Sequence, residues 1–138
     1  MKGSIKKMSK VDGVPSPQAS YSVYSQVGNL IFLAGQVAID PNTGEIPNNF
    51  ADQCRLILDS IKIILKSAGT SMENILKTTV FLRDRAYHSE FDEIYKGYFQ
   101  NGFPARSTIT AELMHKDFLV EIEAVAWIYE EEAEKNDL

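Results

Sequence analysis

Residues 50–68, FADQCRLILDSIKIILKSA, form the most regular pattern in this sequence of 138 residues. Apolar side chains recur there at helical spacing and together make one continuous face: Phe50, Cys54, Ile57, Leu58, Ile61, Ile64, Leu65 and Ala68. Asn49 and Asp52 are suited to cap the start of this helix, and Gly69 is suited to end it. Because a helix with such a stripe must pack on a sheet or on another helix, the segment predicts a layered fold.

Strands are expected on both sides of this helix. The ranges with strand-like composition are 20–27, 30–38, 76–83, 106–113 and 118–129. A second amphipathic helix is expected over about 87–100, and Gly102 and Pro104 follow it. The order β-β-α-β-α-β-β predicts an α+β fold, in which two helices pack on one face of a mixed sheet.

The last expected strand, which contains VEIEAVAW, leaves one sheet face unexplained. Alternation places one all-apolar set toward the helices: Val120, Ile122, Ala124 and Ala126. The opposite face carries Glu121 and Glu123 beside Val125 and Trp127. That mixture is too apolar for open solvent and too charged for the core of a monomer. We therefore expect an oligomer, with an interface on this face that also holds a polar site.

Composition favours a single small soluble domain. The 15.5 kDa chain is 44% hydrophobic and 24% charged, and no apolar stretch is long enough to span a bilayer. We expect an N-terminal arm over 1–17, one domain over 18–129 and an acidic tail over 130–138. The one cysteine, Cys54, lies on the apolar helix face and is interpreted as a core residue. A reducing, cytoplasmic location is expected.

Charge and motifs narrow the possible chemistry. The net charge is −5, and a mildly acidic body disfavours nucleic acid as a partner. The sequence lacks a phosphate-binding Gly-rich loop, HExxH and CxxC, and His88 and His115 have no ligand spacing. No metal and no cofactor are therefore expected, and no membrane partner.

A small polar set on the expected sheet is the best candidate for a site: Tyr21, Gln36, Arg106, Ser107, Glu121 and Glu123. Arg106 follows Pro104-Ala105 at the start of a strand, and a guanidinium can hold a carboxylate through two parallel hydrogen bonds. Glu121 could act as a general acid or base if burial raised its pKa. On position alone, a solvent-exposed Arg and a merely interfacial Glu remain open. The residues themselves indicate at most an oligomeric pocket for a small anionic ligand.

Several stretches give the chain a strong resemblance to the RidA/YjgF family of enamine and imine deaminases. The motifs that carry it span most of 18–128: VGNLIFLAGQ (27–36), IDPNTGEI (39–46), AG (68–69), KTTVFLRD (77–84), PARS (104–107) and VEIEAVA (120–126). Each motif alone is weak, whereas all of them in order are highly specific.

This resemblance implies a chorismate mutase-like trimeric fold, with a site in each cleft between subunits. It also implies cofactor-independent hydrolysis of 2-iminopropanoate and 2-iminobutanoate to 2-oxo acids and ammonia. By position, Arg106 corresponds to the arginine that binds the substrate carboxylate, and Glu121 to the glutamate near the hydrolytic water. Tyr21 and Gly35 correspond to residues that border the ligand.

The chain departs from the family pattern near this expected site. Ala34 replaces a common Ser, Thr108 a common Cys, and Asp92 a common Asn. A carboxylate at Asp92, if it lies near the cleft, is expected to disfavour bulky anionic substrates. Three alternatives therefore stay open: another enamine such as an aminomuconate or aminoacrylate, a regulatory module that binds 2-oxo acids without turnover, and RNA cleavage or translational inhibition. The acidic body weighs against the last of these.

Overall fold

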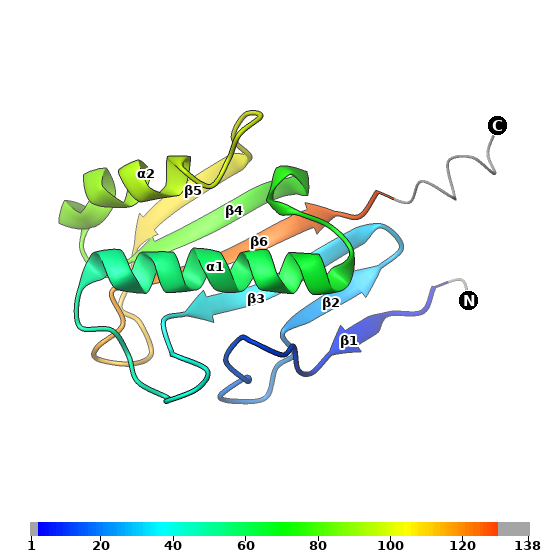
Figure 1. Ribbon diagram of the computed structural model, residues 1–138, viewed down its shortest axis with the longest axis horizontal. Coiled ribbons are helices and arrows are strands. Elements are labelled where there is room, and N and C mark those ends of the chain that lie inside the picture. The colour runs from blue at the N-terminus through cyan, green and yellow to red at the C-terminus, as the bar shows by residue number, and fades with distance from the viewer. Residues whose placement is uncertain (1–2, 130–138) are drawn as a thin grey trace.

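The structure, a computed structural model, describes residues 3–129. One six-stranded sheet carries two α-helices on one of its faces, and α1 lies across the middle of the sheet (Figure 1). The elements are β1 (Lys6–Met8), β2 (Tyr24–Val27), β3 (Leu30–Val37), α1 (Phe50–Ala68), β4 (Ile75–Leu82), α2 (His88–Lys96), β5 (Ala105–Thr110) and β6 (Val120–Trp127), with short 3₁₀ turns at Met72–Asn74 and Arg85–Tyr87. The predicted α+β class is confirmed.

Helix α1 begins and ends where the sequence predicts. The Asp52 backbone N–H donates to the Asn49 side-chain oxygen at 2.9 Å, and Gly69 ends the helix with a φ of 92°. A positive φ of this kind is cheap only for glycine. The apolar stripe faces the sheet, and Cys54, Ile57 and Leu58 have no exposed surface.

The sheet is mixed because β4 and β5 run parallel, whereas every other neighbouring pair of strands is antiparallel. The strand order is β1-β2-β3-β6-β4-β5, so β6, the last strand in sequence, lies in the middle. Helix α2 lies over the β5 edge of the sheet (Figure 1). This topology gives β6 two flanking strands and leaves one side of β5 open.

Several details differ from the sequence prediction, and one is that the strand expected over 106–113 ends at Thr110. Lys6–Met8, within the expected arm, pairs with β2 as strand β1, which no pattern in the sequence indicated. Strand β2 is shorter than expected and begins at Tyr24. Helix α2 ends at Lys96, because the backbone then tightens into i→i−3 hydrogen bonds such as Phe99 N–H to Lys96 O. The predicted tail over 130–138 lies outside the described residues.

The two faces of the sheet differ as the alternation in β6 predicts. Val120, Ile122, Ala124 and Ala126 are buried beneath the helices. On the other face, Leu30 lies opposite Trp127 and Phe32 opposite Val125 in the β3–β6 register. Phe32 is 45% exposed, and Leu30 and Trp127 are each 37% exposed. We call these four residues (Leu30, Phe32, Val125 and Trp127) the open-face patch.

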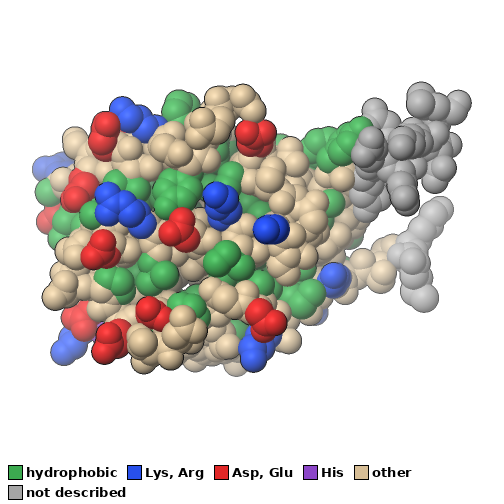
Figure 2. Space-filling model, in the orientation of Figure 1, with side chains coloured by type: hydrophobic (Ala, Val, Ile, Leu, Met, Phe, Trp, Pro, Cys, Tyr) green, Lys and Arg blue, Asp and Glu red, His purple; other side chains and the backbone are tan. Residues whose placement is uncertain are grey.

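The helix-covered side carries charges of both signs. Figure 2 shows Lys and Arg side chains interspersed with Asp and Glu over this side, and no continuous basic area stands out. Neither α-helix within residues 3–129 has both the length and the apolar character needed to cross a bilayer.

Candidate active site

The predicted site residues separate into two groups on opposite faces of the sheet. Tyr21, Ala34, Gly35 and Glu121 line one cleft on the open face. Arg106 is opposite Thr78 in the parallel β4–β5 register, and Thr78 is buried under α2. The Arg106 side chain therefore lies on the helix-covered face, where it meets Asp92 and Thr108. Within one chain, Arg106 and Glu121 do not share a cavity.

Glu121 lies on β6 between two strands that shield it from water. In the sheet register its neighbours are Val37 on β3 and Phe81 on β4, both apolar. Glu123, two residues further along the same face, adds a second negative charge. Burial, and to a lesser extent the charge of Glu123, raises the pKa of the Glu121 carboxyl above its ordinary value. A carboxyl group whose pKa is raised returns a bound proton less readily to water than an ordinary glutamate, and it is a stronger base for a proton on a reacting group.

Gly35 makes room for the Glu121 side chain. The β3–β6 register is interrupted between Leu33 and Gln36, so β3 carries a bulge at residues 34 and 35. A Cβ atom on residue 35 would collide with the Glu121 carboxylate, and it would lie 2.9 Å from Glu121 Cδ. Only glycine lets the carboxylate lie against the backbone of β3 at this point.

The cleft that contains Glu121 has a volume of about 320 Å³. Its walls come from the segment before β2, from the β3 bulge and from the loop before β6: Gln18, Ala19, Tyr21, Ala34, Gly35, Val37, Met114, Phe118 and Glu121. The lining is mainly apolar, with Glu121 and Tyr21 as its main polar groups. A cleft of this size and composition suits a small organic ligand.

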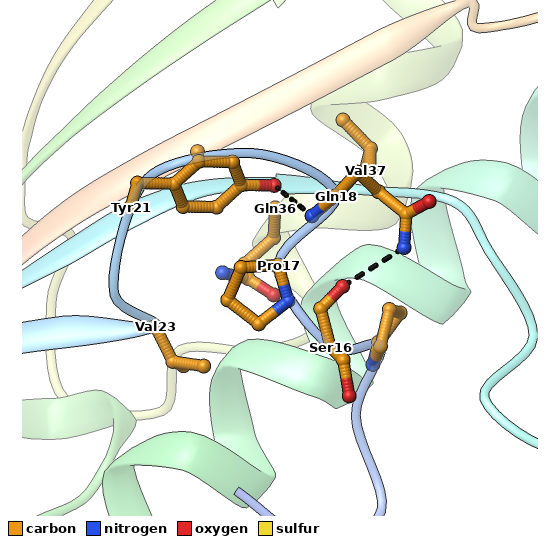
Figure 3. A pocket seen from close by; sticks show the side chains of 9 residues that line it. Ser16, Pro17, Gln18, Tyr21, Val23, Gln36 and Val37 are labelled. Carbon is orange, nitrogen blue, oxygen red and sulfur yellow. Dashed lines mark hydrogen bonds between the residues drawn. The ribbon is translucent and has the colours of Figure 1, made fainter. Parts of the chain in front are cut away.

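Tyr21 is fixed by the segment that precedes it. Its hydroxyl oxygen accepts a hydrogen bond from the Gln18 backbone N–H at 3.2 Å, and the Gln18 side chain in turn donates to Ser16 O at 2.9 Å (Figure 3). Tyr21 is 46% exposed, so part of its surface is accessible to a ligand or another chain.

Two residues that the sequence analysis did not single out hold the loop before β6. The buried Gln53 side chain donates to Pro47 O and Asp117 O, and accepts from the Leu119 N–H, each at 2.8 Å. Arg83 donates to Phe118 O at 2.5 Å and to His115 O at 2.7 Å. These bonds position Met114 and Phe118 at the cleft. Gln53 stands next to the apolar stripe of α1 in the sequence, and this position could have indicated a buried polar side chain. No sequence pattern indicated the role of Arg83.

Arg106 is held on several sides. Its Nε donates to Thr108 Oγ1 and its Nη1 donates to Asp92 Oδ1, both at 3.0 Å. The guanidinium carbon lies 5.3 Å from the Phe91 ring centre and 4.8 Å from that of Tyr95. Cation–π contacts of this kind fix a guanidinium without using up its hydrogen-bond donors.

The Tyr95 ring beneath Arg106 is itself anchored. Its hydroxyl shares a buried 2.7 Å hydrogen bond with Thr78, the residue opposite Arg106 in the sheet. An open cavity of about 290 Å³ adjoins the guanidinium; it is lined by Asp92, Tyr95, Lys96, Phe103, Pro104 and Arg106. Strand β5 thus directs the Arg106 side chain toward α2 and this cavity.

The remaining candidates have structural surroundings. Gln36 is buried on the helix side and donates to Ala34 O, which supports the bulge. Burial raises the pKa of the Cys54 thiol to about 12, so the prediction of a core cysteine is confirmed. Ser107 and Glu123 are exposed on the open face. Among residues 3–129, no three His, Cys, Asp or Glu side chains are grouped as a metal site requires.

Comparison with known sequences places the chain in one protein family. The family model described as Endoribonuclease L-PSP matches residues 12–128. A RutC family protein of Pyrococcus horikoshii is 40% identical over 124 residues, which are 89% of this chain and 98% of that protein. TdcF of Escherichia coli K12, provisionally named a reactive intermediate deaminase, is 36% identical over 125 residues. These residues are 88% of this chain and 97% of TdcF.

Solved structures agree with these sequence matches. RidA from an Antarctic Psychrobacter superposes with a TM-score of 0.85 and 28% identity, covering 89% of this chain and all of that one (100%). Escherichia coli TdcF with bound serine gives a TM-score of 0.84 and 35% identity, and the match covers 90% of this chain and 100% of the TdcF chain. Fold and sequence thus define an α+β protein of the RidA/YjgF type. The chain belongs to the family described as Endoribonuclease L-PSP, in which some relatives are named as reactive intermediate deaminases.

Proposed function

We propose that this protein is a cofactor-independent deaminase of short 2-imino acids, with 2-iminopropanoate and 2-iminobutanoate as substrates. The products are the 2-oxo acid and ammonia. The observation that carries the proposal is the pair of chemically matched groups: Arg106, rigidly held for a carboxylate, and Glu121, whose raised pKa suits proton transfer beside a small cleft. The name given to TdcF, a reactive intermediate deaminase, supports the same chemistry.

Arg106 would bind and orient the substrate. A guanidinium holds a carboxylate through parallel hydrogen bonds, and a substrate held in this way presents its C=N carbon in a fixed direction. Phe91 and Tyr95 restrict the guanidinium from below, so little motion has to be lost on binding.

Glu121 would manage the protons of hydrolysis. Its carboxylate accepts a proton from water as the water oxygen bonds to the imine carbon, and the electron pair of the C=N bond moves to nitrogen, which takes that proton from Glu121. The carbinolamine then collapses: Glu121 accepts the hydroxyl proton and passes it to the amino nitrogen, the C–N bond breaks, ammonia leaves and a C=O bond forms. One well-placed acid or base contributes about 10²–10⁴ in rate. A high-pKa carboxyl group can both accept and return the proton.

The complete site requires two copies of the chain, because Arg106 and Glu121 lie on opposite faces of the sheet. We propose a homotrimer in which the edge formed by β5 and α2 of one subunit approaches the open face of the next. The open-face patch supports this assembly, since exposed Phe and Trp side chains on a sheet are typical of interfaces. Tyr21 and Glu121 would then come from one subunit and Arg106 from its neighbour.

The open alternatives make different predictions. Replacement of a common Ser by Ala34 and of a common Asn by Asp92 keeps another enamine, such as an aminomuconate or aminoacrylate, as a candidate substrate. A regulatory module would bind 2-oxo acids in the same cleft without turnover. An RNA-cleaving activity would need phosphate contacts, and the interspersed charges of Figure 2 favour the small-molecule function.

A coupled assay tests the proposal directly. A threonine dehydratase generates 2-iminobutanoate, semicarbazide traps it, and semicarbazone formation is followed with and without this protein. The wild type should suppress the semicarbazone, Arg106→Ala should not, and Arg85→Ala, which removes an exposed arginine of the 3₁₀ turn, should behave as wild type. No suppression by the wild type would contradict the proposal. RNA binding that weakens steeply with salt would favour the nucleic-acid function instead.

A further inference from the structure

The Arg106 guanidinium does not face its cavity as an isolated cation. Asp92 Oδ1 lies 3.0 Å from Nη1, and Thr108 Oγ1 lies 3.0 Å from Nε. Within residues 3–129, Nη2 is the guanidinium nitrogen that has no protein hydrogen-bond partner. The Arg106 side chain is 19% exposed, whereas that of Asp92 is 55% exposed, so the carboxylate stands at the entrance of the cavity.

We propose that Asp92 is the specificity-determining residue of this site, and that it selects carboxylates carrying a nearby N–H donor over dicarboxylates. The preferred class is the zwitterionic 2-imino or 2-amino acid with a small side chain. This inference rests on the proposed function, because it assumes that Arg106 receives the substrate carboxylate.

The hydrogen-bond geometry makes Asp92 a competitor of the ligand. A carboxylate can approach a guanidinium through Nε and Nη2, or through Nη1 and Nη2. In the first approach it shares Nε with Thr108, and in the second it shares Nη1 with Asp92. A neutral hydroxyl yields to a carboxylate without charge repulsion, whereas Asp92 repels it. In the first approach Asp92 still occupies Nη1 of the same guanidinium, so a negative charge lies beside the bound ligand in either case.

The surrounding charges do not relieve this repulsion. Lys96 is the other cation that lines the cavity. Its Nζ lies 2.9 Å from Glu93 Oε1, so the Glu93 carboxylate balances its positive charge. Arg106, Asp92, Lys96 and Glu93 together sum to zero. A ligand with a second carboxylate gains no attraction here, while a protonated imine or amine close to the first carboxylate can donate to Asp92 Oδ2.

The position of Asp92 is fixed by its helix. Its neighbours Phe91 and Tyr95 on α2 are buried and pack under the Arg106 guanidinium, so the turn of helix that bears Asp92 cannot rotate away. The competition is therefore a built-in property of the site, and a single substitution at residue 92 can remove it while Arg106 keeps its ring contacts.

Binding measurements on the intact protein test this inference. The probes are 2-oxobutanoate (one carboxylate), 2-oxoglutarate (two carboxylates) and serine (a zwitterion), each titrated calorimetrically into the wild type, Asp92→Asn and Glu90→Gln. Glu90→Gln changes the net charge of α2 by the same amount, but Glu90 is exposed and does not line the cavity. Arg106→Ala reports whether each probe uses the guanidinium.

Asp92→Asn should strengthen 2-oxobutanoate binding by about fivefold, the effect of one partly exposed charge pair, and 2-oxoglutarate binding by more, while serine gains less or loses affinity. Glu90→Gln should leave this ranking as it is in the wild type. If Asp92→Asn and the wild type rank the three probes alike, while Arg106→Ala loses them, the role of Asp92 is wrong and the function stands. If Arg106→Ala binds all probes as the wild type does, both proposals are wrong.

Discussion

Gly35 on β3 and Glu121 on β6 lie in direct contact across the sheet, and the Glu121 carboxylate fills the space that a side chain on residue 35 would need. The contact aims the carboxylate into the cleft beside Tyr21 and keeps it partly shielded from water. A residue without a side chain thus determines where a candidate proton-transfer group points.

Gly35→Ala should therefore damage activity more than stability. The added methyl group must push the Glu121 carboxylate away, which we expect to lower imine turnover at least tenfold, because misplacing a reacting group by about 1 Å can cost about 10² in rate. The free energy of unfolding should fall by about 1–3 kcal/mol through overpacking. Gly97→Ala is the matched control: Gly97 has an ordinary φ of −69°, and its Cβ would lie 3.4 Å from Ile94 O. Equal turnover in both variants would contradict the role of Gly35.

The pH dependence of turnover should report Glu121. Turnover needs the carboxylate form of Glu121, which accepts a proton from water and is lost as the pH falls. Because the pKa of Glu121 is raised, activity should decline at a higher pH than it would with an ordinary glutamate. Glu123→Gln removes the neighbouring negative charge, lowers the pKa of Glu121 and should move this acid limb to lower pH. If the acid side of the pH–activity profile is the same in Glu123→Gln as in the wild type, a group other than Glu121 controls it.

The same raised pKa has a consequence for stability. The folded chain holds the Glu121 proton more tightly than the unfolded chain does, so ionisation of Glu121 opposes folding as pH rises through and above its ordinary value of 4.5. Glu121→Gln cannot ionise. The free energy of unfolding of Glu121→Gln minus that of the wild type should therefore increase as the pH rises from acid to neutral. Urea denaturation of both proteins at equal subunit concentration measures this difference. A constant difference across this range would contradict the raised pKa.

Mixing two inactive variants should restore activity if the site spans two subunits. Arg106→Ala and Glu121→Gln each lack one half of the site. In trimers refolded from an equal mixture, about a quarter of the sites would pair an intact Arg106 with an intact Glu121 from the neighbour. Turnover near that fraction, with no activity in either variant alone, is the expected result. Lack of recovery in trimers shown to be mixed would place both residues of a site in one chain.

Gln53→Leu should destabilise the fold and the cleft together. It leaves Pro47 O, Asp117 O and the Leu119 N–H without their partner in a buried place, and we expect a loss of about 3 kcal/mol or more in the free energy of unfolding. Gln26→Leu, which removes one exposed bond to Gly28 O, should change stability by less than about 0.5 kcal/mol. Similar denaturation midpoints for the two variants would refute the anchoring role of Gln53.

Local patterns in the sequence determined most of the secondary structure. The stripe and caps of α1 lie within 21 consecutive residues, 49–69, and the alternation of β6 within eight, so each is legible without knowing what packs against it. Motif resemblance also singled out Arg106, Glu121, Tyr21 and Gly35 before any geometry was known.

Tertiary structure alone decided how these residues are distributed. Strand β1 forms only because β2 offers an open edge, and three residues carry too little pattern to predict it. The contacts of Asp92 with Arg106, of Gln53 with Leu119 and of Gly35 with Glu121 join segments that are distant in sequence. The placement of Arg106 and Glu121 on opposite faces follows from the β4–β5 and β6 registers, which depend on long-range pairing. Local sequence sets the period of each strand, but only packing sets which strands meet and therefore which side chains share a site.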